Sequence, residues 1–408
     1  MEGLRTRGQP AAAAAIRAML ASGFPHALLL VGPGGVGKTT LALDVAAALL
    51  CQGPADMTRP CRACRGCRMV EHGNHPDLHR LAPAGSGAQI SIGGREDRGV
   101  RELVHDLAFL PVEGGARVAI VEAAHRMTED AQSAFLKTLE EPPSGTTIIL
   151  CADDEERLLP TIRSRVARVR LGPMGSRDVE AVLVEQGIAD APTAARLSRI
   201  TDGRPGHAIA LARAPQAVIL RGEIARTLLD LLDASLTSRL TGLRDLAVRS
   251  AELLRAIDDG LLQASASEQP PRQSRGRGRT TKAQVETVGA ATSHAAAGES
   301  PAVEPEPAVE ERSTRAPAAE RRRAALALLD IWRAVVRDLA LVVVGEPGAV
   351  RDQALVDDLH GPASRLDLAA IGSTLQRLET AAEQLEGNVS PELVLDVLAI
   401  HWTSSRAA

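Results

Sequence analysis

The sequence predicts an α/β fold, with a parallel sheet covered by helices on both faces, followed by a small helical unit and a larger helical domain. Three observations predict it. A glycine-rich loop at residues 32–39 lies between an apolar run and an Ala/Leu-rich stretch. Strand and helix patterns alternate from residue 27 to residue 171. After Gly172 and Pro173 the periodicity is helical.

The glycine-rich loop, GPGGVGKT at residues 32–39, has the spacing of a phosphate-binding P-loop. Glycines allow consecutive backbone N–H groups to face one anion, and the following helix adds a partial positive charge. Lys38 is expected to reach the outer phosphates and Thr39 to serve Mg²⁺. The alternative is a glycine-rich strand-to-helix turn that carries Lys-Thr by chance and binds no phosphate. The candidate residues for ATP or ADP with Mg²⁺ are Gly32, Gly34, Gly35, Gly37, Lys38, Thr39, Thr40 and Glu122.

The remaining elements follow from apolar runs and helical spacing. Strands are expected at 27–31, 118–121, 146–151 and 166–171, and helices at 10–22, 39–50, 100–109 and 128–139. Helices at 177–187, 191–201 and 206–213 form a compact unit, and further helices cover 217–263, 321–341, 366–385 and 391–402.

The composition limits the possible functions. The net charge of the 408 residues is only −4, so no general basic field attracts nucleic acid. Tyrosine is absent and the only aromatic residues are three Phe and two Trp, which disfavours a base-stacking, single-strand binder. We expect no membrane-spanning segment and no signal peptide, and therefore a cytoplasmic protein.

A change of composition divides the C-terminal part. Residues 264–320 carry only four valines as bulky apolar side chains, and we expect this stretch to be a disordered linker. Its basic first half could contact DNA phosphates, although a solvated linker is the simpler interpretation. The predicted domains are a nucleotide-binding core (1–172), a helical lid (173–213), and a helical domain (214–263 plus 321–408).

Four cysteines, Cys51, Cys61, Cys64 and Cys67, form the pattern C-x9-C-x2-C-x2-C within the core. Two C-x2-C motifs that share Cys64, together with the nearby Cys51, suit a tetrahedral Zn²⁺ site. Four sulfur ligands leave no open coordination position, so the predicted zinc at residues 51–67 is structural. The alternative is a loop with free thiols. Cys151 lies in a predicted strand and is expected in the core.

The residues that follow the predicted strand at 118–121 indicate whether the chain can hydrolyse ATP. P-loop ATPases place an acidic residue after this strand to hold Mg²⁺, and a neighbouring glutamate orients the attacking water. Here Glu122 can serve the metal, but Ala123 occupies the position of the water-orienting carboxylate. A methyl group can neither accept a proton nor align water. We expect a chain that binds ATP or ADP and hydrolyses ATP poorly, which leaves its status as an enzyme uncertain.

These motifs resemble bacterial clamp-loader proteins of the AAA+ class. The shared features are the P-loop, the four-cysteine insertion and the stretch AHRMTEDAQSAFLKTLEEPPSGTTIILCADDEERLLPTIRSR at residues 124–165. The resemblance covers residues 24 to about 213 closely and the remainder only in helical character. It implies an AAA+ core and lid, with the C-terminal helices forming the collar through which a ring oligomerises.

Two branches of this family compete. The gamma/tau motor ATPase resembles D-E-x-H after the second strand, where this chain has Glu122-Ala123-Ala124-His125. The motor's lid also carries a sensor arginine where this chain has a glycine, in the segment DGRPGHA at residues 202–208. NHPDL at 74–78, GRPG at 203–206 and NVSP at 388–391 resemble the stator-like delta-prime branch.

The delta-prime resemblance implies a role in DNA replication, as part of the DNA polymerase III holoenzyme but without a polymerase site. Such a subunit joins gamma/tau and delta subunits in a hetero-pentameric ring that loads the sliding clamp onto primed DNA. Arg165 would be an arginine finger, donated in trans to a neighbouring motor's nucleotide. The alternatives are the motor subunit itself and a signalling P-loop module whose helical tail binds a regulatory protein.

Overall fold

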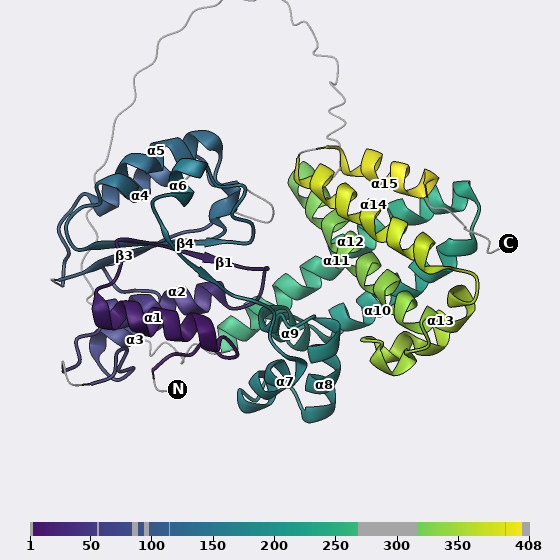
Figure 1. Ribbon diagram of the computed structural model, residues 1–408, viewed down its shortest axis with the longest axis horizontal. Helices are drawn as coiled ribbons and strands as arrows, with labels where there is room; N and C mark the ends of the chain where they lie inside the picture. Colours follow the sequence, from purple (N-terminus) through teal and green to yellow (C-terminus); the bar gives the residue numbers. More distant parts are fainter. Residues whose placement is uncertain are drawn as a thin grey trace, which may run out of the picture.

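A computed structural model of the chain describes residues 3–54, 57–83, 89–93, 98–113, 115–267, 317–387 and 389–401. The N-terminal α/β unit and the C-terminal helices lie on opposite sides of the molecule in Figure 1, and α7 to α9 lie below and between them. The predicted fold class, a parallel α/β sheet followed by helices, is confirmed.

The sheet has five parallel strands in the order β2-β3-β4-β1-β5. They are β1 (Ala27–Val31), β2 (Leu78–Leu81), β3 (Arg117–Val121), β4 (Thr146–Ala152) and β5 (Ala167–Arg170). β2 is an additional strand that the sequence pattern did not reveal. It lies at the sheet edge and buries only its first and last residues, so it lacks the apolar run of a central strand.

Side chains alternate between the two faces of the sheet. Leu28 and Leu30 of β1 face the helices α1 (Pro10–Ser22), α2 (Lys38–Leu49) and α3 (Arg65–Glu71). Leu29 faces α4 (Val100–Leu107), α5 (Glu129–Glu140), α6 (Pro160–Arg163) and the 3₁₀ turn η1 (Ala124–Arg126). Both layers are visible in Figure 1. The core is therefore a three-layer sandwich in which both faces of β1 are buried.

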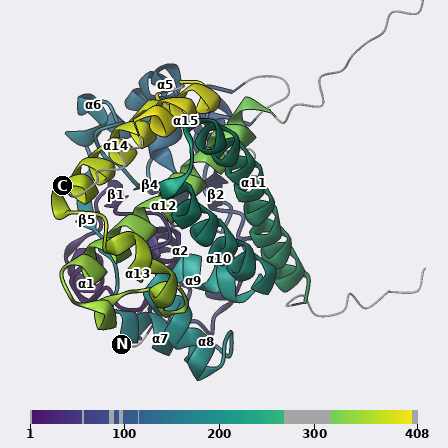
Figure 2. The same cartoon turned by 90° about the vertical axis from the view of Figure 1, so that its right-hand side faces the viewer.

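The remaining helices share one apolar core that runs from Met174 to Ala399. The first three helices are α7 (Ser176–Glu185), α8 (Ala191–Ile200) and α9 (Pro205–Ala212). They are followed by α10 (Pro215–Asp230), η2 (Leu231–Asp233), α11 (Leu236–Ser267), α12 (Ala318–Val343), η3 (Pro347–Ala349), η4 (Gln353–Leu355), α13 (Val356–Ala363), α14 (Leu368–Glu386) and α15 (Pro391–Ile400). Figure 2 shows α10, α11 and α12 side by side.

The predicted linker at 264–320 falls mostly on residues 268–316, which lie outside the described part of the chain. Its two ends are helical, because α11 continues to Ser267 and α12 begins at Ala318. Trp402, the expected end of the last helix, is also outside the described residues. Within the described residues, none of the helices is both long enough and apolar enough to cross a membrane.

Candidate nucleotide site and cysteine centre

The P-loop connects the carboxyl end of β1 to the first turn of α2. β1 lies between β4 and the edge strand β5, so the loop emerges one strand in from the edge of the sheet. Gly35 and Gly37 have φ angles of 80° and 101°, a left-handed conformation that glycine adopts without a Cβ penalty. Gly37 directly precedes Lys38, the first residue of α2. The chain thus points a helix N-terminus into the space above the sheet.

Lys38 is 7% exposed, and its ammonium group is held by three oxygens. It donates to the carbonyl oxygens of Gly32 (2.6 Å) and Pro33 (2.7 Å). Its third partner is Asp153, whose Oδ1 lies 2.7 Å from Lys38 Nζ. Asp153 directly follows β4 and was not among the residues singled out from the sequence.

A cavity of about 1060 Å³ opens beside this lysine, large enough for a nucleotide. The predicted residues that line it are Gly34, Gly35, Gly37, Lys38, Thr39, Thr40 and Glu122. Gly32 is not among the described lining residues, but its carbonyl holds Lys38. Three other parts of the chain also line the cavity. The N-terminal segment contributes Arg5, Thr6 and Arg7, and α11 and α12 contribute Asp258 and Arg323. The region of α7 to α9 contributes Met174, Val182, Gln186, Pro205, Gly206 and Ile209.

Glu122 follows β3 and lines the cavity, and it is already paired with a cation. Arg80 of β2 donates to Glu122 Oε1 from Nε (2.9 Å) and from Nη2 (2.5 Å). The next residue, Ala123, also lines the cavity and has a φ of 50°. The side chain at this position is a methyl group. The segment that follows β3 thus offers one carboxylate, engaged by an arginine, where a hydrolytic site uses two.

The helix α9 closes over the P-loop. The backbone N–H of Gly206 donates to the carbonyl of Gly35 at 2.8 Å. The His207 ring packs on the same glycine, where a Cβ would lie 2.7 Å from its Cδ2. The residue as a whole is exposed, but desolvation of the imidazole where it packs on Gly35, together with nearby Arg204, lowers the pKa of His207 to about 4. The imidazole is therefore neutral near pH 7.

Arg165 lies on the molecular surface just before β5 and is not among the described residues that line the cavity. Its side chain is 37% exposed and pairs with Glu140 at the end of α5 (2.6 Å). It also donates to the carbonyl oxygen of Thr161 at 2.9 Å. An arginine on this surface is separated from the nucleotide cavity of its own chain but is accessible to a neighbouring molecule.

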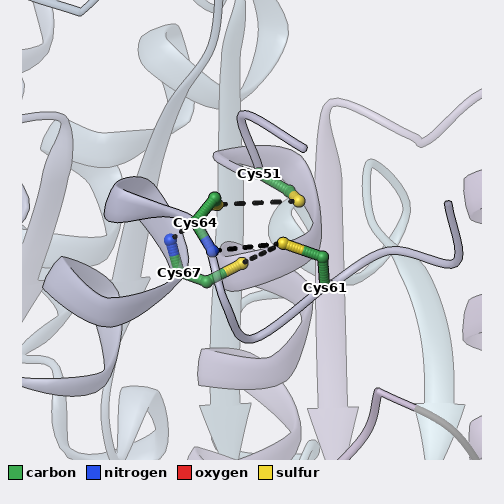
Figure 3. A group of neighbouring side chains, drawn as sticks. All are labelled: Cys51, Cys61, Cys64 and Cys67. Carbon is green, nitrogen blue, oxygen red and sulfur yellow. Dashed lines mark hydrogen bonds between the residues drawn. The ribbon is translucent and has the colours of Figure 1, made fainter. Parts of the chain in front are cut away.

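The four clustered cysteines come from the end of α2, the following loop and α3. Their Sγ atoms all lie within 4.8 Å of one another, and the Cys51–Cys64 and Cys61–Cys67 pairs are each 4.0 Å apart. Figure 3 shows the sulfur atoms converging on one point. A tetrahedral Zn²⁺ with Zn–S bonds of about 2.3 Å would place the sulfurs roughly 3.8 Å apart, so the arrangement fits the metal.

Backbone N–H groups support the thiolate form of Cys61 and Cys64, whereas burial raises the pKa of Cys67. The N–H of Cys64 donates to Cys61 Sγ and that of Cys67 to Cys64 Sγ, both at 3.4 Å. The backbone N–H groups of Cys64 and Ala63 lower the pKa of Cys61 to about 6. The fifth cysteine, Cys151, lies in β4, where it is 1% exposed and burial raises its pKa to about 12.

A buried carboxylate that the sequence analysis missed links the cysteine loop to the cavity wall. Asp44 of α2 is 1% exposed. Its Oδ2 accepts hydrogen bonds from the backbone N–H groups of Arg5 and Thr6 (both 2.9 Å) and from Thr6 Oγ1 (2.7 Å). Its Oδ1 pairs with Arg62, which lies between two of the clustered cysteines. The one available clue was a lone acidic residue within an otherwise apolar helix.

Comparison with known proteins gives a consistent match for the α/β unit. Residues 8–175 match the model of the family described as DNA polymerase III, delta subunit. The chain is 41% identical to DNA polymerase III subunit delta′ of Pseudomonas aeruginosa over 140 residues, which are 34% of this chain and 41% of that protein. It is 32% identical to the delta′ subunit of Bacillus subtilis over 202 residues, 49% of this chain and 58% of that protein.

Two other similarities are weaker. The tau subunit of Salmonella typhimurium is 34% identical over 191 residues, 46% of this chain and 28% of that protein. A DNA polymerase III gamma subunit-related protein from Thermotoga maritima aligns with 97% of this chain and 99% of its own, at 16% identity and a TM-score of 0.37. That TM-score supports no further argument.

The chain spans about half the length of the delta′ relatives it matches, and the family match covers the α/β unit that carries the P-loop and the cysteines. Of the motifs that resemble delta-prime, NHPDL at 74–78 lies within this region. Residues 8–175 thus match the family described as DNA polymerase III, delta subunit, and the identity to delta′ subunits confirms the resemblance inferred from the sequence.

Proposed function

We propose that this chain is a delta-prime-type subunit of the DNA polymerase III clamp loader. It joins gamma/tau motor subunits and a delta subunit in a five-membered ring that loads the sliding clamp onto primed DNA in the cytoplasm. The observation that carries the proposal is the combination at one site of a complete P-loop with a methyl group at Ala123. Such a site binds a nucleotide, while the motor subunits of the ring hydrolyse ATP.

In this proposal the P-loop binds ATP or ADP with Mg²⁺. The backbone N–H groups of Gly34 to Lys38 and the N-terminus of α2 face the phosphates, and Thr39 and Glu122 serve the metal. When bound, Mg²⁺ neutralises phosphate charge. Glu122 must share its carboxylate with Arg80, and Ala123 can orient no water, so turnover by the isolated chain is slow.

Arg165 is proposed as the group that this chain gives to its neighbour. It lies on the surface, away from its own cavity, and its partner Glu140 is half exposed. Exchanging an exposed ion pair for contact with a phosphate costs little, because surface pairs contribute about 0–1 kcal/mol. A guanidinium placed against a γ-phosphate stabilises the charge of the transition state in the adjoining motor.

The cysteine centre and the helices complete the proposal. Cys51, Cys61, Cys64 and Cys67 would hold a structural Zn²⁺ that fixes the loop between α2 and α3. Residues 173–213 would form the lid, and residues 214–263 with 321–408 the collar that joins the ring.

Reconstitution tests the proposal. The chain is added to motor, delta, clamp and primed DNA, and clamp loading is measured with and without it. We expect a stable complex, loading that depends on this chain, and little ATP turnover by the chain alone. Brisk turnover by the purified chain, abolished by Lys38→Ala, would instead support the motor role, which the similarity to tau keeps as a second candidate. Failure to assemble with motor and delta would reject both roles.

A further inference from the structure

We propose that Asp153 determines the nucleotide preference of the P-loop site. Its carboxylate competes with the outer phosphates for Lys38 and makes the site favour a nucleoside diphosphate over a triphosphate. This inference rests on the nucleotide binding proposed above and concerns which nucleotide is held.

The first argument is a count of hydrogen-bond donors. A lysine ammonium group has three N–H donors. In Lys38 they are matched by three acceptors, at 2.6 Å to Gly32 O, 2.7 Å to Pro33 O and 2.7 Å to Asp153 Oδ1. The two carbonyls belong to the loop itself, so Asp153 is the partner that a phosphate must replace. The P-loop lysine ordinarily meets the β- and γ-phosphates, and here a carboxylate takes that role.

The second argument is the fixed position of Asp153. Ala152, its predecessor, pairs in register with Val31, and the N–H of Gly32 donates to the Ala152 carbonyl at 3.2 Å. The N–H of Asp153 donates to His125 Nδ1 at 3.1 Å. On its other side, a Cβ on Gly34 would lie 3.2 Å from Asp153 Oδ2. The strand pairing and the histidine therefore fix the backbone of Asp153 beside the P-loop, and the ion pair with Lys38 directs its carboxylate, which is 46% exposed, toward the loop.

The third argument is charge. A diphosphate and a triphosphate both draw Lys38 away from Asp153, so this cost is common to them. A γ-phosphate adds negative charge next to a carboxylate whose backbone is anchored beside the P-loop. Like charges at such close range repel each other in a site partly shielded from water, and bound Mg²⁺ offsets part of this repulsion. Glu122 adds a second carboxylate, although Arg80 balances its charge. The additional repulsion therefore weakens the binding of the triphosphate more than that of the diphosphate.

The test is calorimetric titration of the full-length chain with MgADP and with MgATP. Asp153→Asn removes the charge and keeps the shape. We expect it to tighten MgATP binding about tenfold and MgADP binding at most threefold, so that the preference for the diphosphate disappears. Asp153→Glu, which keeps the charge, should retain the preference. Lys38→Ala should weaken both nucleotides.

Asp154→Asn is the matched control. Asp154 is the next residue, carries the same charge and caps the following turn through the N–H of Glu156 at 2.8 Å. Asparagine can make the same cap, so we expect both affinities to equal those of the wild type. Thermal melting checks that each variant is folded, and Asp153→Thr replaces Asp153→Asn if the latter is not.

Equal changes for both nucleotides in Asp153→Asn would overturn the proposal, as would unchanged MgATP affinity or no binding by either the wild type or the variant. A wild type that prefers MgATP would also overturn it. Assembly with motor and delta subunits is scored separately on the same proteins. Normal assembly with no change in preference rejects only the role of Asp153, whereas failed assembly rejects the proposed function.

Discussion

The guanidinium of Arg62, in the loop between Cys61 and Cys64, pairs with the buried carboxylate of Asp44 on the helix that follows the P-loop. Arg62 also donates to the carbonyl of Gly3 at 2.8 Å. Asp44 in turn holds the backbone of the N-terminal segment that lines the nucleotide cavity. The cysteine centre and the cavity wall are therefore tied together through a single carboxylate.

Removing this carboxylate should destabilise the α/β unit. Asp44→Ala leaves Arg62 and two backbone N–H groups without their acceptor, and we expect a loss of about 3 kcal/mol in the free energy of unfolding. Urea denaturation followed by circular dichroism measures it. Asp358→Ala is the control, because it breaks an exposed pair with Arg226 and should cost no more than about 1 kcal/mol. Equal effects of the two changes would contradict the role assigned to Asp44.

Metal content should depend on the four clustered cysteines and not on the fifth. We expect close to one zinc per purified chain, lost in Cys67→Ala, because the cluster then keeps only three thiolates. Cys151→Ala removes an equally buried cysteine from β4 and should retain the metal. Elemental analysis of both variants after gel filtration gives the answer. Fully folded wild-type protein without metal would show that the cluster has another purpose.

Arg165→Ala should leave ring assembly intact and lower the DNA-stimulated ATPase rate of the whole ring. Removing an arginine finger costs 10³–10⁵ in turnover at the site it serves. The matched control is Arg163→Ala at the end of the short helix α6, two residues before Arg165, which breaks a pair with Glu156 at 2.6 Å. We expect the control to behave as the wild type in a steady-state ATPase assay of the reconstituted ring. A normal rate with Arg165→Ala would exclude the finger role.

Acid should destabilise the site through His125. Desolvation, partly offset by Asp153 and reinforced by Arg126, Arg157 and Lys38, lowers the pKa of His125 below its ordinary 6.5. The unfolded chain therefore binds the proton more readily than the folded one. Stability from this residue is complete above about pH 6.5 and is lost as the pH falls through the folded-state pKa.

His125→Gln removes that titration while keeping an acceptor for the N–H of Asp153. We expect the thermal midpoint of the wild type to fall more steeply than that of the variant between pH 7.5 and pH 5. The other histidines with lowered pKa values, His79 and His207, titrate in both proteins and cancel in the comparison. Parallel curves would show that His125 does not contribute.

Much of the α/β unit could be predicted from local pattern. The strands of β1, β3 and β4 are short apolar runs buried on both faces, so their sequences carry a clear pattern. β2 escaped because an edge strand with His79 and Arg80 at its centre has no such run. α13 escaped because it contains Gly361 and Pro362, residues that usually mark the end of a helix.

The residues of the candidate site likewise fall into those that the sequence predicted and those that it did not. The P-loop residues and the clustered cysteines are contiguous or closely spaced, so their chemistry is legible from the sequence. Asp153 and Asp44 were missed because their partners lie 115 and 18 residues away, on Lys38 and Arg62. Such pairs arise from strand order and helix packing, and an isolated acidic residue in a sequence gives no sign of the cation it will meet.

The single apolar core that joins α7–α9 to the C-terminal helices has a mechanical consequence. Close-packed interiors transmit strain. A tilt of α10 to α15 would therefore be passed through this core to α9, whose Gly206 N–H donates to the Gly35 carbonyl of the P-loop. Strain applied at the far end of the molecule is thereby delivered to the mouth of the nucleotide cavity.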